Sequence, residues 1–331
     1  MHFYCPKCSQ TYPLDTFEYK CSCGGLFSFS KQPNEQIPVS VTLGEVVTPI
    51  LERQINGINL QLKLDYYMPT GSFKDRGAFA TVNMMKHLGI TEVVEDSSGN
   101  AGAAFAGYCA AAGIKCHIYL PASTSPGKIK QIAAYGANVV KIEGTRDDVS
   151  AAILQAAKTT YYASHVYNPS FFEGTKSLAH EIAAQVGIPD YIVVPAGNGT
   201  MLLGVYIGFK ELGKLPKIIA VQSAHCTPVY SKFHGKTAMA PNATVAEGIA
   251  VGTPMRIDEM ISAVRESGGE FIIVEDDSVE QMQQELSKMG IYIEPTSGVT
   301  VAGALQYFKD KPETQNAQIV VPLTGSGLKK G

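Results

Sequence analysis

The chain has 331 residues, of which 45% are hydrophobic and 17% are charged, and its 27 basic and 30 acidic residues give a formal net charge of −3. This length suffices for about two domains, and a charged fraction below the roughly 25% of an average soluble domain excludes long disordered regions. Because the charges nearly balance and form no basic stripe, we expect no nucleic-acid partner.

The N-terminus and the most apolar stretch indicate neither a leader nor a membrane segment. Residues 1–7 contain no apolar core and no cleavage signature, so we expect no signal peptide. Residues 101–120 are the most apolar, but Lys115 and His117 interrupt them, whereas a membrane span needs about 20 uninterrupted apolar residues. We therefore expect a cytoplasmic protein without a membrane partner.

Residues 1–32 contain four clustered cysteines. The pairs are Cys5 with Cys8 and, twelve residues later, Cys21 with Cys23. In a cytoplasmic chain such pairs are typical of zinc ligands, and four thiolates can close a tetrahedral structural site. Because the second pair is tighter than the usual Cys-x2-Cys spacing, the alternative is a metal-free knuckle held by local packing.

After the cysteine cluster, short apolar runs alternate with helical patterns. The expected strands are 59–64, 92–96, 115–120, 138–142, 191–195, 217–222, 270–274 and 318–322. The expected helices are 75–88, 101–112, 127–135, 146–160, 174–186, 200–212, 253–266, 277–288 and 297–308. This alternation predicts βα units and parallel sheets covered by helices. We expect three domains: 1–32, 33–165 and 166–331.

A Gly-rich turn follows the expected strand 191–195. It has the sequence Gly197-Asn198-Gly199-Thr200, and a helix is expected to begin there. Backbone N–H groups at such a helix start suit a phosphate. The Walker A pattern is absent and the Rossmann pattern fails at Leu202, so a plain tight turn is the alternative.

A second polar turn, residues 96–102, joins the expected strand 92–96 to the next helix. It reads Asp-Ser-Ser-Gly-Asn-Ala-Gly, and its hydroxyls and N–H groups suit a carboxylate. Capping of the helix by Ser or Asn is the alternative.

Two further segments complete the candidate chemistry. Lys74 lies beside Gly and Ser at the start of an apolar helix, where the helix macrodipole disfavours a solvated lysine. A lysine whose pKa is lowered by burial there suits covalent attachment of a carbonyl compound. Thr324 follows the last expected strand in a Gly-rich turn and offers a neutral hydroxyl.

Together these segments closely resemble the fold type II pyridoxal phosphate (PLP) enzymes, the tryptophan synthase β-like superfamily, and within it the threonine synthase branch. The resemblance covers residues 43–329, and its motifs fall in the family order at 43–49, 69–77, 97–100, 127–137, 173–176 and 324–329. An N-terminal cysteine knuckle also occurs in that branch. The resemblance implies an α/β fold of two three-layer parallel-sheet domains with a small zinc-ribbon-like knuckle, and PLP as cofactor.

The resemblance also implies a role for each matching residue. Lys74 would attach PLP and later move protons, with Phe73 beside the ring and Asn100 bonded to the PLP 3′-oxygen. Thr324 would face the pyridine nitrogen; because a hydroxyl cannot hold the pyridinium charge, the site suits elimination and replacement better than transamination. The PLP phosphate would bind at Gly197, Asn198, Gly199 and Thr200. The substrate would bind at Ser97, Ser98, Gly99, Ala101 and His165. Glu294 lies at a family motif, with helix capping as an equal alternative.

The sequence departs from the threonine synthase pattern where the substrate phosphate is held. Those enzymes commonly carry an Arg in an Asn-Pro-aromatic-Arg-x-Glu-Gly segment, but Phe171 stands at that position. His165 and Val166 replace an upstream Asn and Ser, and Ala101 replaces a common hydroxyl. Loss of a bidentate Arg changes a phosphate site. The available replacement cations are His165, Lys176, Lys128 and Arg146.

We therefore expect a PLP-dependent carbon–oxygen lyase of amino-acid biosynthesis, acting as a homodimer on a small amino acid. The first expected reaction converts O-phospho-L-homoserine and water to L-threonine and phosphate. The alternative, which Phe171 favours, is β-elimination or β-replacement on serine, threonine or phosphoserine, as in ammonia-lyases and cysteate synthase. A non-catalytic PLP-fold partner protein is the third hypothesis; the intact Lys74 and Asn100 argue against it.

Overall fold

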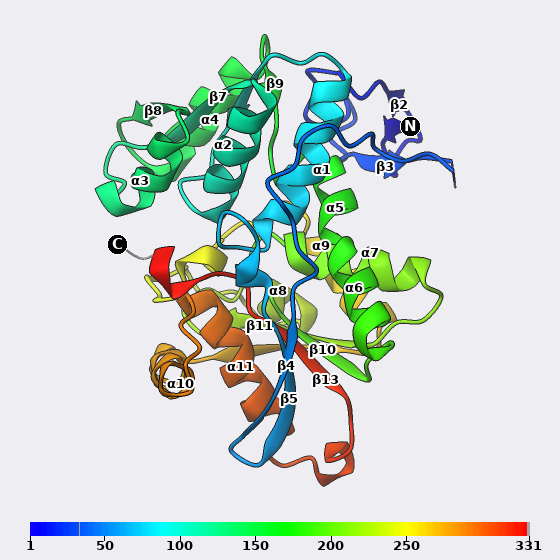
Figure 1. Ribbon diagram of the computed structural model, residues 1–331, viewed down its shortest axis with the longest axis vertical. Coiled ribbons are helices and arrows are strands. Elements are labelled where there is room, and N and C mark those ends of the chain that lie inside the picture. Colours follow the sequence, from blue (N-terminus) through cyan, green and yellow to red (C-terminus); the bar gives the residue numbers. More distant parts are fainter. Residues whose placement is uncertain (33, 330–331) are drawn as a thin grey trace. The chain divides into compact units, whose positions relative to one another are not determined.

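The computed structural model of the protein describes residues 1–32 and 34–329 (Figure 1). By their contacts these residues form two compact units. Unit 1 comprises Met1–Glu45 and Lys74–Gly174, and unit 2 comprises Val46–Phe73 and the chain from Thr175 onward. This partition is discontinuous in sequence, whereas the expected domains 33–165 and 166–331 are continuous. Those limits stay predictions, and residues 33 and 331 lie outside the described part of the chain.

Unit 1 begins with a small antiparallel sheet that contains the cysteine cluster. Its strands are β1 (His2–Tyr4), β2 (Thr11–Tyr12) and β3 (Ser28–Ser30), in the order β2-β1-β3. The rings of Phe3 and Phe27 stack with centroids 5.9 Å apart, and both side chains belong to the hydrophobic core of unit 1. The cysteine segment is thereby anchored on the larger core, as a segment too short for its own core requires.

The main sheet of unit 1 is parallel and has the order β8-β7-β6-β9. The strands are β6 (Glu92–Glu95), β7 (Lys115–Pro121), β8 (Asn138–Ile142) and β9 (Tyr161–Tyr162). The helices are α1 (Lys74–His87), α2 (Asn100–Ala112), α3 (Pro126–Ala134), α4 (Arg146–Ala156) and α5 (Ser170–Thr175). Helix α2 consists mostly of Ala and Gly, so α1 and β7 pack closely against it.

Unit 2 is built on a six-stranded sheet of order β12-β11-β10-β13-β5-β4. The strands are β4 (Ile50–Ile55), β5 (Ile58–Lys63), β10 (Tyr191–Pro195), β11 (Lys217–Ser223), β12 (Glu270–Val274) and β13 (Ile319–Pro322). The helices are α6 (Ser177–Val186), α7 (Thr200–Glu211), α8 (Pro228–Phe233), α9 (Ile257–Glu266), α10 (Asp276–Lys288) and α11 (Pro295–Phe308). Helix α11 packs on four of these strands and is almost wholly buried.

The α/β class and the parallel sheets agree with the sequence prediction, but the short strand β9, helix α8 and several other local features differ from it. Strand β4 was not expected, and it pairs antiparallel with β5 through a turn in which Asn56 and Gly57 have φ of 50° and 82°. The expected helix 174–186 is divided into α5 and α6, and the expected helix 253–266 begins only at Ile257. No helix among the described residues has the length and apolarity to cross a membrane.

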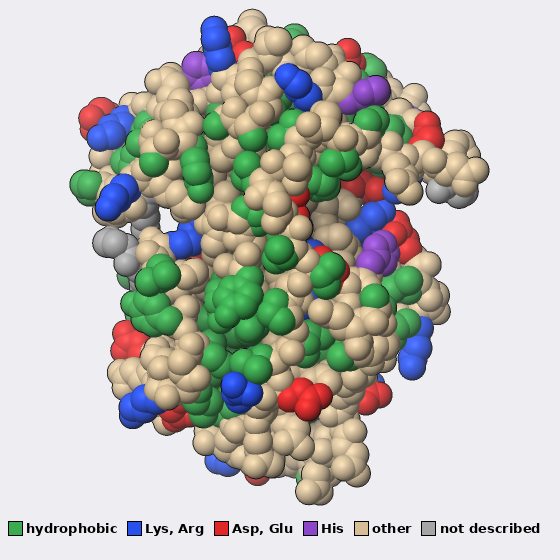
Figure 2. All heavy atoms as spheres, in the orientation of Figure 1, with side chains coloured by type: hydrophobic (Ala, Val, Ile, Leu, Met, Phe, Trp, Pro, Cys, Tyr) green, Lys and Arg blue, Asp and Glu red, His purple; other side chains and the backbone are tan. Residues whose placement is uncertain are grey.

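Charged side chains are sparse and scattered on the face shown in Figure 2, and hydrophobic side chains lie between them. The low charged fraction of the sequence predicts such a surface.

Candidate active site

Lys74 is the first residue of α1, and close packing between α1 and α5 fixes its surroundings. Its Nζ lies 5.8 Å from the ring centroid of the fully buried Phe171. A Cβ at Gly77 would lie 2.3 Å from Phe171 Cε1, and one at Gly174 would lie 1.9 Å from the carbonyl oxygen of Arg76. The two glycines therefore allow the Phe171 ring to lie against the first turn of α1.

The polar turn after β6 packs tightly on the start of α2. A Cβ at Gly102 would lie 1.9 Å from the carbonyl oxygen of Ser97, so this turn needs glycine there. Gly99 precedes the helix and supplies no side-chain cap, and Asn100 is the first helical residue. The Ser97 hydroxyl accepts a hydrogen bond from the Gly99 N–H at 3.3 Å, directly before the first N–H groups of α2, which are the groups that bind anions at helix N-termini.

Two acidic residues that the sequence analysis did not single out, Glu95 and Asp96, lie at the start of this turn. Glu95 is fully buried at the end of β6, and its Oε1 lies 2.7 Å from Nδ1 of His165. Asp96 accepts a hydrogen bond from the Tyr162 hydroxyl at 2.8 Å and lies 3.7 Å from a guanidinium nitrogen of Arg146. The clue in the sequence was the Glu-Asp pair directly before Ser97, at the end of a buried strand.

Burial controls the protonation of Glu95 and of its partner His165. It raises the pKa of Glu95 to about 7, although the charges of Arg146 and Lys74 lower it. Burial, followed by the positive charge of Lys74, lowers the pKa of His165 to about 3. His165 is therefore a neutral imidazole at physiological pH and supplies no positive charge to a ligand.

In unit 2, the turn after β10 has the geometry of a phosphate cradle. Gly199 has a φ of 81°, and a Cβ there would lie 2.6 Å from Met260 Sδ. A Cβ at Gly197 would lie 2.9 Å from Ile249 Cα. Helix α7 begins at Thr200, and Gly199 gives it no side-chain cap, so its first N–H groups suit an anion.

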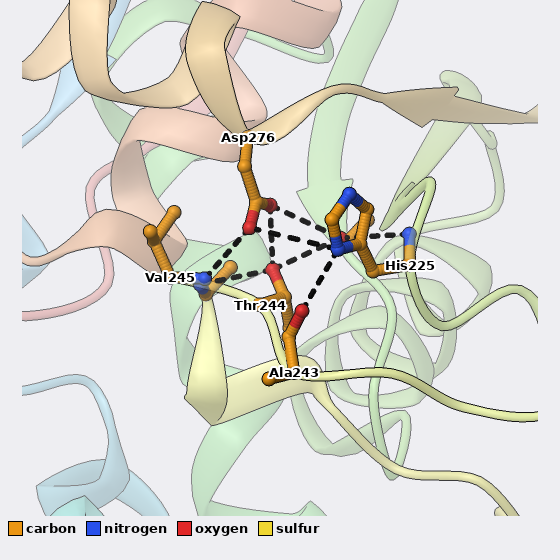
Figure 3. Close-up of polar contacts among 7 residues, drawn as sticks. His225, Ala243, Thr244, Val245 and Asp276 are labelled. Carbon is orange, nitrogen blue, oxygen red and sulfur yellow. Dashed lines mark hydrogen bonds and ion pairs between the residues drawn. The ribbon is translucent and has the colours of Figure 1, made fainter.

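A polar network holds residues 243–245 of unit 2 (Figure 3). Asp276, the first residue of α10, accepts hydrogen bonds from the Thr244 hydroxyl at 2.6 Å and from the Val245 N–H at 2.9 Å. The His225 ring nitrogen Nδ1 lies 2.8 Å from the carbonyl oxygen of Ala243. The network fixes residues 243–245, which lead directly to the short helix Glu247–Ile249 beside Gly197.

The Thr324 hydroxyl is buried in a second network of unit 2. It donates to Glu294 Oε1 at 2.6 Å and lies 2.9 Å from the Ser297 hydroxyl. Glu294 precedes α11 but provides no side-chain cap to it, so its carboxylate serves Thr324 rather than the helix end. The backbone N–H of Phe73 donates to the carbonyl oxygen of Thr324 at 2.9 Å.

The four clustered cysteines come together at the small sheet of unit 1. The Sγ atoms of Cys5 and Cys23 lie 3.5 Å apart, those of Cys8 and Cys21 lie 3.4 Å apart, and all four lie within 4.8 Å of one another. A Cβ at Gly25 would lie 2.5 Å from Cys5 Sγ. Four sulfur donors at these separations are the ligand set that structural zinc prefers.

The residues of each unit fit the parts of PLP that the resemblance assigns to them. Unit 1 offers the amine of Lys74 and the amide of Asn100. Unit 2 offers a cradle that leaves no room for a Cβ at Gly197 or Gly199, together with the buried hydroxyl of Ser72, which has no partner among the described residues. An orphaned buried hydroxyl is costly, which is consistent with a polar ligand nearby.

Comparisons with known proteins agree on one family. Residues 41–325 match the model of the "Pyridoxal-phosphate dependent enzyme" family. The chain is 32% identical to a threonine synthase of Methanocaldococcus jannaschii over 98% of this chain and 92% of that one. It is 34% identical to a threonine synthase of Methanosarcina acetivorans, over 96% of this chain and 83% of that one.

A solved structure shows the same fold. The cysteine synthase of Entamoeba histolytica superposes with a TM-score of 0.76, covers 91% of each chain and is 24% identical in sequence. With the family match and the relatives, this places the chain in the pyridoxal-phosphate dependent enzyme family, as a lyase of fold type II with threonine synthases among its homologues.

Proposed function

We propose that this lyase releases a leaving group from the side chain of a small α-amino acid and, in the manner of threonine synthases, adds a nucleophile in its place. The observation that carries the proposal is Lys74 at the first turn of α1, held beside Phe171 and followed in unit 1 by the turn 97–102. When bound, PLP supplies an electron sink for the substrate α-carbon.

The chain's own residues bind and orient both molecules in this proposal. Lys74 holds the cofactor and then moves the α-proton, and Phe73 packs beside the ring. Asn100 donates to the cofactor's 3′-oxygen, and the Thr324 hydroxyl, oriented by Glu294, faces the pyridine nitrogen. The cofactor phosphate binds at Gly197, Asn198, Gly199 and Thr200. The substrate carboxylate binds at Ser97, Ser98, Gly99 and Ala101, and His165 borders the substrate side chain.

Two substrate classes are supported by different observations. The threonine synthase relatives support conversion of O-phospho-L-homoserine and water to L-threonine and phosphate. The buried ring of Phe171, at the position where those enzymes commonly carry Arg, supports elimination or replacement on serine, threonine or a similar amino acid. The geometry favours the second class because an aromatic ring offers a phosphate no hydrogen bond and no charge.

The deciding experiment incubates PLP-loaded protein with O-phospho-L-homoserine and assays free phosphate and threonine together. Equal amounts of both that vanish in Lys74→Ala would establish threonine synthase activity. If the protein instead catalyses elimination on hydroxyl amino acids, L-serine or L-threonine yields ammonia and a 2-keto acid. Biological activity that persists in Lys74→Ala would instead support a non-catalytic partner protein.

We further propose that Cys5, Cys8, Cys21 and Cys23 bind one structural zinc ion, and that the enzyme is a cytoplasmic homodimer. The separations of the four Sγ atoms support the metal. Exposed hydrophobic side chains of unit 2, Val47 at 66% and Tyr292 at 55% exposure among them, support a subunit interface. Metal analysis and sedimentation equilibrium test these two points.

A further inference from the structure

The Glu95 carboxylate contains a buried acceptor that the proposed function does not use. Its side chain is fully buried, and its Oε1 lies 2.7 Å from Nδ1 of His165. Its other oxygen, Oε2, is also buried and has no hydrogen-bond partner among the described residues. A buried acceptor without a donor is costly, so a ligand that donates a hydrogen bond would stabilise this site.

The acceptor lies in the neighbourhood of Lys74, within unit 1. Lys74 Nζ lies 5.8 Å from the Phe171 ring centroid, and the Phe171 and His165 ring centroids lie 6.1 Å apart. His165 in turn bonds Glu95, and the charge of Lys74 acts on both residues. Glu95 also leads through Asp96 into the turn proposed for the substrate carboxylate. A donor at Glu95 Oε2 is therefore most simply the side chain of the bound amino acid.

The residues that could replace the missing Arg as a phosphate-binding cation are otherwise engaged. Burial keeps His165 neutral, with a pKa of about 3. Arg146 lies 3.7 Å from Asp96, and Lys176 donates to Glu211 at 2.8 Å in unit 2. The side chain of Lys128 lies outside the described part of the chain. In unit 1, the charges of Arg146 and Lys74 are thus opposed by the two carboxylates of Glu95 and Asp96.

We propose that Glu95, with His165, forms the substrate side-chain subsite, and that it selects amino acids whose side chain ends in a hydrogen-bond donor without negative charge, a hydroxyl or an ammonium group, over phosphate esters. This inference rests on the proposed lyase function and names its substrate class. A hydroxyl or ammonium group can donate to Glu95 Oε2. At pH 8, a phosphate ester carries about two negative charges and Glu95, whose pKa is about 7, is mostly ionised, so the carboxylate repels the ester.

The test compares matched ligands on the PLP-loaded enzyme. Dissociation constants for L-homoserine against O-phospho-L-homoserine, and for L-serine against O-phospho-L-serine, are measured at pH 8. The readout is the change in PLP absorbance on rapid mixing, before turnover. The wild type should bind each hydroxyl compound at least about tenfold more tightly than its phosphate ester, a difference of 1.4 kcal/mol. L-2,4-diaminobutyrate shows whether an ammonium group binds better still.

Two variants assign the preference to Glu95. Glu95→Gln keeps the shape and one acceptor but removes the charge, so the preference should fall at least about tenfold. The matched control is Glu92→Gln, at the other end of β6, where the carboxylate is exposed and contacts His117 at 2.8 Å. This control should leave the preference unchanged. Should Glu95→Gln fail to fold, the wild-type ratios decide by themselves.

The outcomes separate this inference from the proposed function. A wild type that binds a phosphate ester as tightly as its hydroxyl partner overturns the acidic subsite, as does a Glu95→Gln variant with the wild-type preference. If O-phospho-L-homoserine also yields threonine, the lyase function stands without the subsite. If no amino acid alters the PLP absorbance, the proposed function fails, and the subsite fails with it.

Discussion

The backbone N–H of Phe73 donates a hydrogen bond to the carbonyl oxygen of Thr324, with 2.9 Å between the two atoms. The residue directly before Lys74 is therefore tied to the turn whose hydroxyl is proposed to face the cofactor's pyridine nitrogen. A bridge between Ser72 and Gly325 strengthens this connection. A backbone bond of this kind is independent of side-chain identity, so substitutions at Phe73 should leave it in place.

Replacing Lys74 by Ala should abolish covalent cofactor binding and lower the rate by at least about 10³-fold, since attachment and proton transfer are both lost. The absorbance spectrum of the purified protein and a product assay measure the two effects. Lys141→Ala, at an exposed position, is the control and should behave like the wild type. Unchanged turnover in Lys74→Ala would contradict the role given to this lysine.

Replacing Gly77 by Ala should destabilise the protein by about 1–3 kcal/mol, because the new Cβ would meet the Phe171 ring at 2.3 Å. Chemical denaturation measures the loss. The double variant Gly77→Ala with Phe171→Leu should recover part of it by giving the methyl group room. Strictly additive effects of the two substitutions would refute the proposed contact.

Glu95→Gln should change the pH dependence of folding stability. The folded-state pKa of Glu95 is raised from 4.5 to about 7, so its contribution to stability is present below pH 4.5 and is lost as the pH rises through 7. Glutamine does not ionise. At 1.36 kcal/mol per pKa unit, the free energy of unfolding of the variant should rise by about 2–3 kcal/mol relative to that of the wild type between pH 5 and pH 8. A gap between the two unfolding free energies that is independent of pH would count against this burial effect.

Asp276→Ala should weaken PLP binding by about tenfold, because residues 243–245 lose the acceptor that holds them and the segment behind Gly197 loosens. Titration of the cofactor-free protein with PLP measures the affinity. Asp277→Ala changes the exposed neighbour on the same helix and should have no effect. Equal affinities in the two variants would show that the network does not support the cradle.

Removal of the metal should unfold the N-terminal sheet locally. Cys8→Ser should lower the zinc content from one ion per chain to well below one, and the small sheet should become open to proteolysis. Cys226→Ala, outside the cluster, should retain the metal. A wild-type protein that is purified under reducing conditions with zinc supplied and still contains none would contradict the zinc assignment.

The alternation of apolar runs and helical patterns was sufficient to predict most parallel strands and most helices, though not the two-residue strand β9. It missed β4, although Asn56-Gly57 between apolar runs is a typical hairpin signal. The contact of Glu95 with His165 could not be predicted in this way. It depends on β6 pairing with β9, where Val94 lies opposite Tyr162. Strand order is set by tertiary packing, so periodicity along the chain could not predict this contact.

The position of β13 in its sheet has a consequence for synthesis of the protein. This strand lies between β10 and β5, so it joins segments that precede it by more than a hundred residues. On the ribosome, the hairpin of β4 and β5 emerges early, but β5 can pair with β13 only after residues 319–322 have been synthesised. Until then its exposed strand edge is open to wrong partners, and chaperone protection during translation should matter most in this interval.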